Sequence, residues 1–127
     1  MKWLLIAAGG ALGSMARYGL QSAARGALDI GFPVGTVAVN ILGCFFIGLL
    51  TGMFAGGMLL RDEIRIGLTV GLLGGFTTFS AFELETFLLV RDEEPWLALL
   101  NVALSCAIGL AAVWAGFRLA HHWFGVA

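Results

Sequence analysis

The middle of the chain reads Gly71-Leu72-Leu73-Gly74-Gly75-Phe76-Thr77-Thr78-Phe79-Ser80-Ala81-Phe82, with two adjacent glycines and a Thr-Thr-x-Ser cluster inside an apolar run. Paired glycines weaken a helix, and hydroxyl groups can bond the backbone groups that a weakened helix releases. We therefore expect a helix break between Gly74 and Thr78. Carbonyls exposed at such a break can coordinate a small cation such as Na⁺, whereas the alternative is a kink that the threonines themselves satisfy.

The apolar character of this segment extends over the whole chain. Of the 127 residues, 60% are apolar and 12% are charged, whereas a soluble domain carries about 25% charged residues. Because a membrane-spanning helix takes about 20 residues, the sequence predicts an all-α membrane protein, a single transmembrane domain over residues 1–127. The four expected transmembrane helices cover residues 3–26, 33–60, 66–90 and 95–119. The net charge of −1 argues against nucleic acid as a partner, since that requires clustered Lys and Arg.

Two stretches leave alternatives open. Residues 31–60 hold no charge and would measure about 45 Å as a straight helix, against a hydrocarbon core of about 30 Å. This helix must tilt, bend, or begin after a non-helical turn around Gly31, Phe32 and Pro33. At the start of the chain, Lys2 followed by an apolar run also fits a secretory signal peptide. Because the apolar character resumes after Arg17, we expect four spans rather than three.

The basic residues of the loops give almost no orientation signal. They divide into Lys2, Arg61, Arg65 and Arg118 on one face and Arg17, Arg25 and Arg91 on the other. Cytoplasmic loops normally hold an excess of Lys and Arg, so a chain without that excess can insert in both directions. Two opposite copies would then pair as an antiparallel, dual-topology homodimer; the alternative is one orientation fixed by details that a count does not capture.

Glycines at four-residue spacing mark the helix contacts. The series are Gly9 with Gly13, Gly48 with Gly52 and Gly56, and Gly67 with Gly71 and Gly75. Such stripes let helix backbones approach closely. They predict tight packing among the first three spans.

Aromatic and polar side chains within the spans are the candidates for an ion path. Phe79 and Phe82 lie three residues apart, next to Ser80 and to the in-span acids Glu83 and Glu85. Phenyl ring edges are electropositive and can line an anion pore together with hydroxyl and amide donors. The ordinary alternative is that both rings face lipid or fill the core.

Other polar residues occur in pairs one helical turn apart. Thr36 precedes Asn40 by one turn, and Asn101 precedes Ser105 by one turn, so each pair shares a helix face. An amide in hydrocarbon marks either a pathway or a helix contact. Arg17, the one in-span base, either draws an anion into a vestibule or extends to the membrane interface.

Three blocks of the sequence resemble the signature blocks of the CrcB/Fluc fluoride channels. They are residues 9–18 (GGALGSMARY), 35–43 (GTVAVNILG) and 74–82 (GGFTTFSAF). The resemblance covers all four spans. It implies an antiparallel homodimer with two fluoride pores and a central structural Na⁺ held by broken third helices. It also implies a prokaryotic inner-membrane protein that passively exports fluoride from the cytoplasm and so relieves fluoride toxicity.

The resemblance assigns roles to particular positions. It makes Phe79 and Phe82 the pore-lining rings and Asn40 the pore amide. It makes Gly74 and Thr77 the sources of backbone carbonyls for Na⁺, and it places Arg17 and Glu85 in the aqueous vestibule. The hydroxyl groups that it places along the ion path are those of Thr36, Thr78, Ser80 and Ser105. Ala81 departs from the family pattern, where threonine is common, and removes one hydroxyl near the rings.

Two other function classes fit the sequence less well. A proton-coupled small multidrug-type antiporter has a similar length, but it needs a carboxylate in the first span, which here offers only Arg17. An enzyme needs a nucleophile with a base or a metal set. Cys44 and Cys106 stand alone, and His121 and His122 lie at the tail.

Overall fold

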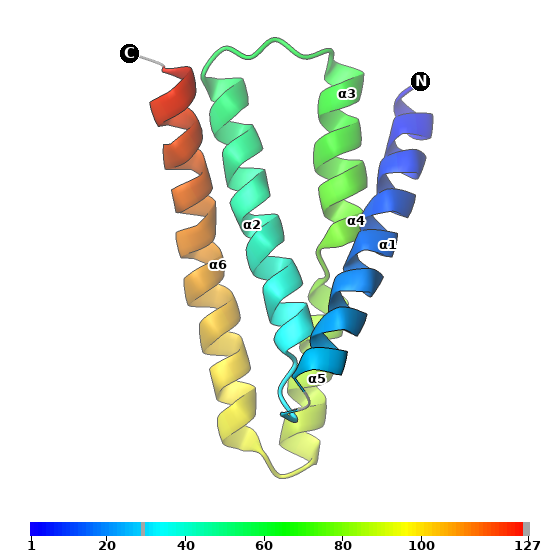
Figure 1. Cartoon of the computed structure of the whole chain (residues 1–127), viewed down its shortest axis with the longest axis vertical. Helices are drawn as coiled ribbons and strands as arrows, with labels where there is room; N and C mark the ends of the chain where they lie inside the picture. The colour runs from blue at the N-terminus through cyan, green and yellow to red at the C-terminus, as the bar shows by residue number, and fades with distance from the viewer. Residues whose placement is uncertain (29, 126–127) are drawn as a thin grey trace.

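The computed structural model describes residues 1–28 and 30–125, and every regular element in these ranges is a helix. Figure 1 shows the helices running roughly along one long axis, with the beginning of α1 (Lys2–Ala27) and the end of α6 (Pro95–Phe124) at the same end of the molecule. The hairpin between α5 (Phe79–Arg91) and α6 lies at the opposite end. Helices that run along one axis are expected for a chain whose apolar segments each cross the same hydrocarbon layer.

The first helix, α1, covers Lys2–Ala27, and the second, α2, covers Val34–Ala55. The turn between them includes Gly31, whose φ of 68° favours glycine. Pro33 precedes the first helical residue of α2, so the long uncharged stretch does begin with a non-helical turn. Its predicted end at residue 60 was wrong, because α2 stops at Ala55 and a loop with Gly57 at φ 88° follows.

The third segment consists of four short helical pieces. The elements are α3 (Asp62–Ile66), the π-helix η1 (Gly67–Leu73), α4 (Gly74–Phe76) and α5 (Phe79–Arg91). Between α4 and α5 the backbone is extended, with φ and ψ of −80° and 159° at Thr77 and −149° and 118° at Thr78. The last helix, α6, covers Pro95–Phe124.

Within the described residues, three segments are long and apolar enough to cross a membrane: Val34–Ala55, Asp62–Arg91 and Pro95–Phe124. Helix α1 has sufficient length, with 26 residues, but it is not among the three. Its three basic residues, Lys2, Arg17 and Arg25, contribute to this lower apolar character.

Glycines join α1 to the third segment. A Cβ added at Gly13 would overlap the carbonyl oxygen of Leu72, and one added at Gly75 would lie 2.6 Å from the carbonyl oxygen of Gly10. Side chains at these positions would push the helices apart. The predicted contact between the glycine stripes of the first and third spans is therefore present.

The glycine stripe of α2 packs against α6 instead. A Cβ at Gly48 would overlap the carbonyl oxygen of Val113, and one at Gly116 would overlap that of Phe45. In Figure 1, α2 and α6 run side by side over most of their length. The prediction that this stripe joins the first three spans was wrong, because a stripe fixes how closely a helix is approached and not which helix approaches it.

Candidate functional site

The extended residues between α4 and α5 are held by the side-chain amide of Asn40. Its Oδ1 accepts a hydrogen bond from the Thr78 backbone N–H at 2.8 Å, and its Nδ2 donates to the Thr78 carbonyl at 2.9 Å. The Thr78 hydroxyl in turn accepts a hydrogen bond from the Ala81 N–H at 3.2 Å and caps α5. One amide on α2 therefore satisfies both backbone groups of the residue where the helix stops.

The interruption falls after the glycine pair and not on it. Gly74 and Gly75 are both helical, and the small size of Gly75 serves the contact between α4 and α1 described above. Thr77 occupies space that Gly43 leaves open, since a Cβ at Gly43 would overlap the Thr77 methyl group. The backbone thus departs from the helix where Asn40 and Gly43 of α2 receive it.

The same geometry affects two carbonyl groups. In a continuous helix the Thr78 N–H would donate to the Gly74 carbonyl, but here it donates to Asn40. The Thr77 carbonyl accepts a hydrogen bond from Arg17 Nη1 at 3.3 Å. Gly74 and Thr77 both line a cavity of about 350 Å³ between α2 and the third segment, which also contains Asn40, Cys44 and Phe79.

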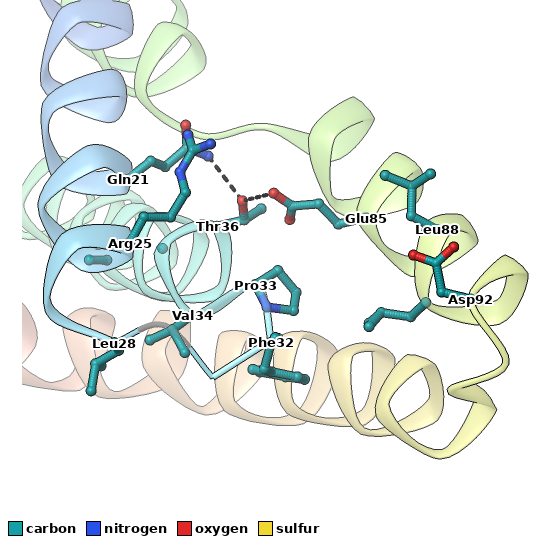
Figure 2. Close-up of a pocket in the computed structure, with 14 residues that line it drawn as sticks. Gln21, Arg25, Leu28, Phe32, Pro33, Val34, Thr36, Glu85, Leu88 and Asp92 are labelled. Atoms are coloured by element: carbon teal, nitrogen blue, oxygen red, sulfur yellow. Dashed lines mark hydrogen bonds between the residues drawn. The ribbon is translucent and has the colours of Figure 1, made fainter.

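A second cavity, of about 330 Å³, lies between α1, α2 and α5 (Figure 2). Within it, Gln21 Nε2 donates to the Thr36 hydroxyl at 3.0 Å, and the Thr36 hydroxyl donates to Glu85 Oε1 at 2.8 Å. The other carboxylate oxygen, Oε2, is buried and has no hydrogen-bond partner among the described residues. Arg25 and Asp92 also line this cavity.

Asp92, one of the charged residues that line this cavity, is paired with Arg91. Arg91 Nε donates to Asp92 Oδ1 at 2.7 Å. This hydrogen bond lowers the pKa of the Asp92 carboxyl below its usual value, and the positive charge of Arg91 acts in the same direction. Asp92 is therefore ionised at neutral pH.

A third cavity, of about 330 Å³, lies between α1 and the start of α5. Arg17, Ser80 and Thr78 line it together with Ser14 and Tyr18. Gln21 lines both this cavity and the one that contains Glu85. Thr78 lines both this cavity and the one that contains Gly74. Arg17 and Glu85, which the resemblance places in one vestibule, thus line separate cavities on either side of Gln21.

The two phenylalanines have opposite environments. Their ring centroids are 5.8 Å apart, but Phe79 is 74% exposed and Phe82 is 8% exposed. The Phe82 carbonyl accepts a hydrogen bond from the Thr86 hydroxyl at 2.7 Å, and Thr86 accepts one from Asn101 Nδ2 at 2.9 Å. Phe82 is therefore packed within the chain, whereas Phe79 projects from it.

Most of the predicted site residues meet around the end of α4. Asn40, Thr78, Ser80, Arg17 and Phe79 line neighbouring cavities. Phe82 and Ser105 line none of the three cavities. Sequence reasoning missed Gln21 as a site residue. One signal could have found it, because Gln21 lies one turn after Arg17 and is the only glutamine in the chain.

Long apolar helices, with cavities between them that include polar side chains, define a multi-pass helical membrane protein. Residues 4–117 match the family model described as CrcB-like protein, Camphor Resistance (CrcB). The chain belongs to this family.

Similar proteins cover almost the whole chain. A protein of Solibacter usitatus is 48% identical over 94% of this chain and 98% of its own length. Proteins of Geobacter sulfurreducens and Thermus thermophilus are each 47% identical, over 92% and 93% of this chain and 94% of their own lengths. All three relatives are named fluoride-specific ion channel FluC.

Proposed function

We propose that this protein is a passive, fluoride-selective channel that exports fluoride from the cytoplasm. The observation that carries the proposal is that relatives sharing nearly half of its residues over almost its full length are named fluoride-specific ion channels. The relatives' names give no support to the antiporter alternative, nor to an enzyme. The protein would lie in the inner membrane of a prokaryotic cell.

The cavities offer the chemistry that fluoride requires. Fluoride holds its water tightly, so a pore must replace that water with several hydrogen-bond donors while binding weakly enough to release the ion. The cavity beside Ser80 offers hydroxyl groups and the Arg17 guanidinium. The neighbouring cavity offers the second N–H of the Asn40 amide and the exposed ring of Phe79. Together these groups would form a donor-lined route past the end of α4.

Passive transport is sufficient for export. Neutral HF enters a cell from an acidic medium and ionises inside, which raises the internal fluoride concentration. The negative membrane potential and the concentration gradient then drive the anion outward. Phe79, Phe82, Asn40, Thr36, Thr78, Ser80 and Ser105 remain the proposed path residues.

We propose that the functional unit is an antiparallel homodimer of four-span subunits. Phe79 is largely exposed in the single chain and adjoins the cavity that contains Asn40. A second copy would cover this ring and complete the pore wall, so that each pore receives phenylalanines from both subunits. The almost equal division of Lys and Arg between the two ends is compatible with both orientations.

The carbonyls of Gly74 and Thr77 fit a structural Na⁺ between two such copies. Gly74 lacks the usual N–H partner from Thr78, and both residues line one cavity. Carbonyl oxygens suit Na⁺, and two carbonyls from each subunit would give four oxygens. The ion would supply positive charge that holds the carbonyl ends of two α4 helices together. Asn40 and Arg17 would fix the backbone that presents these oxygens.

The test of the proposed function is ion flux from liposomes. Purified protein should release fluoride far faster than chloride, as measured with ion-selective electrodes. Phe79→Ile should lower fluoride flux without changing the elution volume of the protein in detergent, because Phe79 packs little within its own chain. Equal or absent flux of both ions would contradict the channel, and a C-terminal reporter accessible from only one side would contradict the antiparallel dimer.

A further inference from the structure

Gln21 stands at the junction between two cavities. It lines the cavity of Glu85 on one side and the cavity of Arg17 and Ser80 on the other. Its amide nitrogen contacts neither Glu85 nor Arg17 but the Thr36 hydroxyl, at 3.0 Å. Figure 2 shows the amide, the hydroxyl and the carboxylate in a row across α1, α2 and α5. Any effect of Gln21 on Glu85 must therefore pass through Thr36.

The direction of these hydrogen bonds follows from counting protons. A threonine hydroxyl carries one proton, and an ionised carboxylate can only accept. The Thr36 proton is therefore committed to Glu85, which lies 2.8 Å away. Gln21 must present its NH₂ group and not its oxygen, because two acceptors cannot share the single hydroxyl proton. The amide thus prevents the hydroxyl from turning away from the carboxylate.

We infer that Gln21 is a positioning residue that holds the Glu85 carboxylate on Thr36 of α2 and so fixes where this charge lies beside the fluoride route. This inference rests on the proposed channel function. Glu85 keeps one buried oxygen without a hydrogen-bond partner among the described residues. A carboxylate released from Thr36 is free to turn toward the guanidinium of Arg25, which lines the same cavity. Its negative charge would then no longer lie where Thr36 holds it, and the electrostatic potential that a fluoride ion meets along the route would change.

The first test removes the amide. Gln21→Leu should lower fluoride flux about tenfold, the effect of losing one hydrogen bond that orients a charged group. The elution volume in detergent should stay unchanged. Ser22→Ala is the matched control, since Ser22 is the next polar residue on α1 and is exposed outside the three cavities. Wild-type flux in Gln21→Leu would overturn the inference while leaving the proposed channel intact.

The second test asks whether the effect passes through Thr36. In a Thr36→Val background, Gln21→Leu should cause no further loss of flux, because the intermediary is gone. Losses that multiply independently would show that Gln21 acts by another route and would overturn the inference.

The third test reads the carboxylate without measuring transport. The infrared carboxylate band of Glu85, assigned as the band lost in Glu85→Gln, should shift in Gln21→Leu and in Thr36→Val but not in Ser22→Ala. An unshifted band in Gln21→Leu would overturn the inference even if flux fell. Because this readout needs no ion flow, it remains decisive if the wild-type protein proves not to conduct fluoride.

A double variant that exchanges the amide of Gln21 and the carboxylate of Glu85 tests whether the position of the charge matters. Gln21→Glu sets two acceptors against one hydroxyl proton and should lower both flux and thermal stability. Adding Glu85→Gln restores a donor, a hydroxyl and an acceptor in the reverse order. The double variant should regain the thermal stability but not the flux, since its carboxylate now lies on α1. Full recovery of flux would show that the position of the charge is irrelevant and would overturn the inference.

Discussion

Two helix contacts in this molecule depend on glycine. One joins α2 to α6, and the other joins α1 to η1 and α4. In both, glycines admit a neighbouring backbone where any side chain would overlap it. Among the described residues, no side-chain hydrogen bond joins α2 to α6. By contrast, Ser14 and Arg17 of α1 donate to carbonyls of Gly75 and Thr77. Close packing is thus common to both pairs, and polar chemistry is confined to one.

Substitution of a buried glycine should cause the largest effect, and it should do so in both pairs. Gly116→Val and Gly13→Val each place a Cβ against a backbone oxygen, of Phe45 and Leu72 respectively. We expect each to cost about 3 kcal/mol of stability, because backbone cannot move aside as a side chain can. The measurement is the melting temperature in detergent and the fraction that elutes as a single species.

Gly19→Val is the control for this prediction. It lies on α1, and a Cβ there meets nothing within 4 Å in the single chain. It should fold as the wild type does. A normal melting temperature for Gly116→Val would mean that α2 and α6 are not packed as closely as described.

Loss of the Asn40 amide should have a larger effect than loss of the Asn101 amide, which lies outside the candidate site. Asn40→Leu leaves the N–H and carbonyl of Thr78 without their partner, at a cost of about 2 to 4 kcal/mol, and should abolish fluoride flux. Asn101→Leu removes an amide that is 1% exposed but lies at the α5–α6 contact. Its cost should be about 1 kcal/mol. Melting temperatures and flux of the two variants give the comparison, and equal flux losses would contradict it.

The turn between α5 and α6 contains a strained backbone residue, and relief of this strain should have a smaller effect than the substitutions above. Glu93, in the turn between α5 and α6, has a φ of 63°, which side chains other than glycine rarely adopt. Glu93→Gly should therefore raise stability by about 0.5 kcal/mol, after allowing for the greater freedom of glycine in the unfolded chain. Thermal melting in detergent measures this gain, and a lower melting temperature would show that the turn is not strained.

The smallest effect should come from the Arg91–Asp92 pair, because it is exposed. Its contribution is present above the ordinary pKa of an aspartate and is lost as pH falls through the lowered pKa of Asp92. Asp92→Asn should therefore melt slightly below the wild type at neutral pH, and the two curves should meet in acid. A difference that persists in acid would assign the effect to something other than this charge.

The sequence predicts the helices better than it predicts their partners. Hydropathy located the long apolar segments because a helix that crosses the hydrocarbon core must be apolar along its whole length. The window 74–78 predicted for an interruption contains the extended residues Thr77 and Thr78. The glycines within that window are helical, however, and Gly75 serves the contact with α1. A glycine pair alone does not reveal which of these two roles it has.

The hydrogen-bond partners of the polar residues could not be predicted from the sequence, because the partners lie far apart along the chain. Thr36 lies 15 residues from Gln21 and 49 from Glu85 along the chain, so no helical periodicity relates them. Asn40 was predicted as a polar site because an amide in hydrocarbon is costly. Its actual partner, the backbone of Thr78, follows only from the fold. The sequence thus indicates single site residues, but which of them hydrogen-bond to one another follows only from the three-dimensional structure.

The bond from Arg17 to the Thr77 carbonyl has a consequence for how a ribosome delivers this chain into a membrane. Helix α1 is synthesised before the third segment, yet it is not among the segments apolar enough to cross on composition alone. Its guanidinium gains an acceptor only when residue 77 has been made. We therefore expect α1 to settle in the bilayer only after the third segment has emerged and its Thr77 carbonyl can accept the hydrogen bond from Arg17. Order of synthesis and order of insertion then differ, and a nascent chain truncated before residue 77 should leave its first helix accessible to proteases.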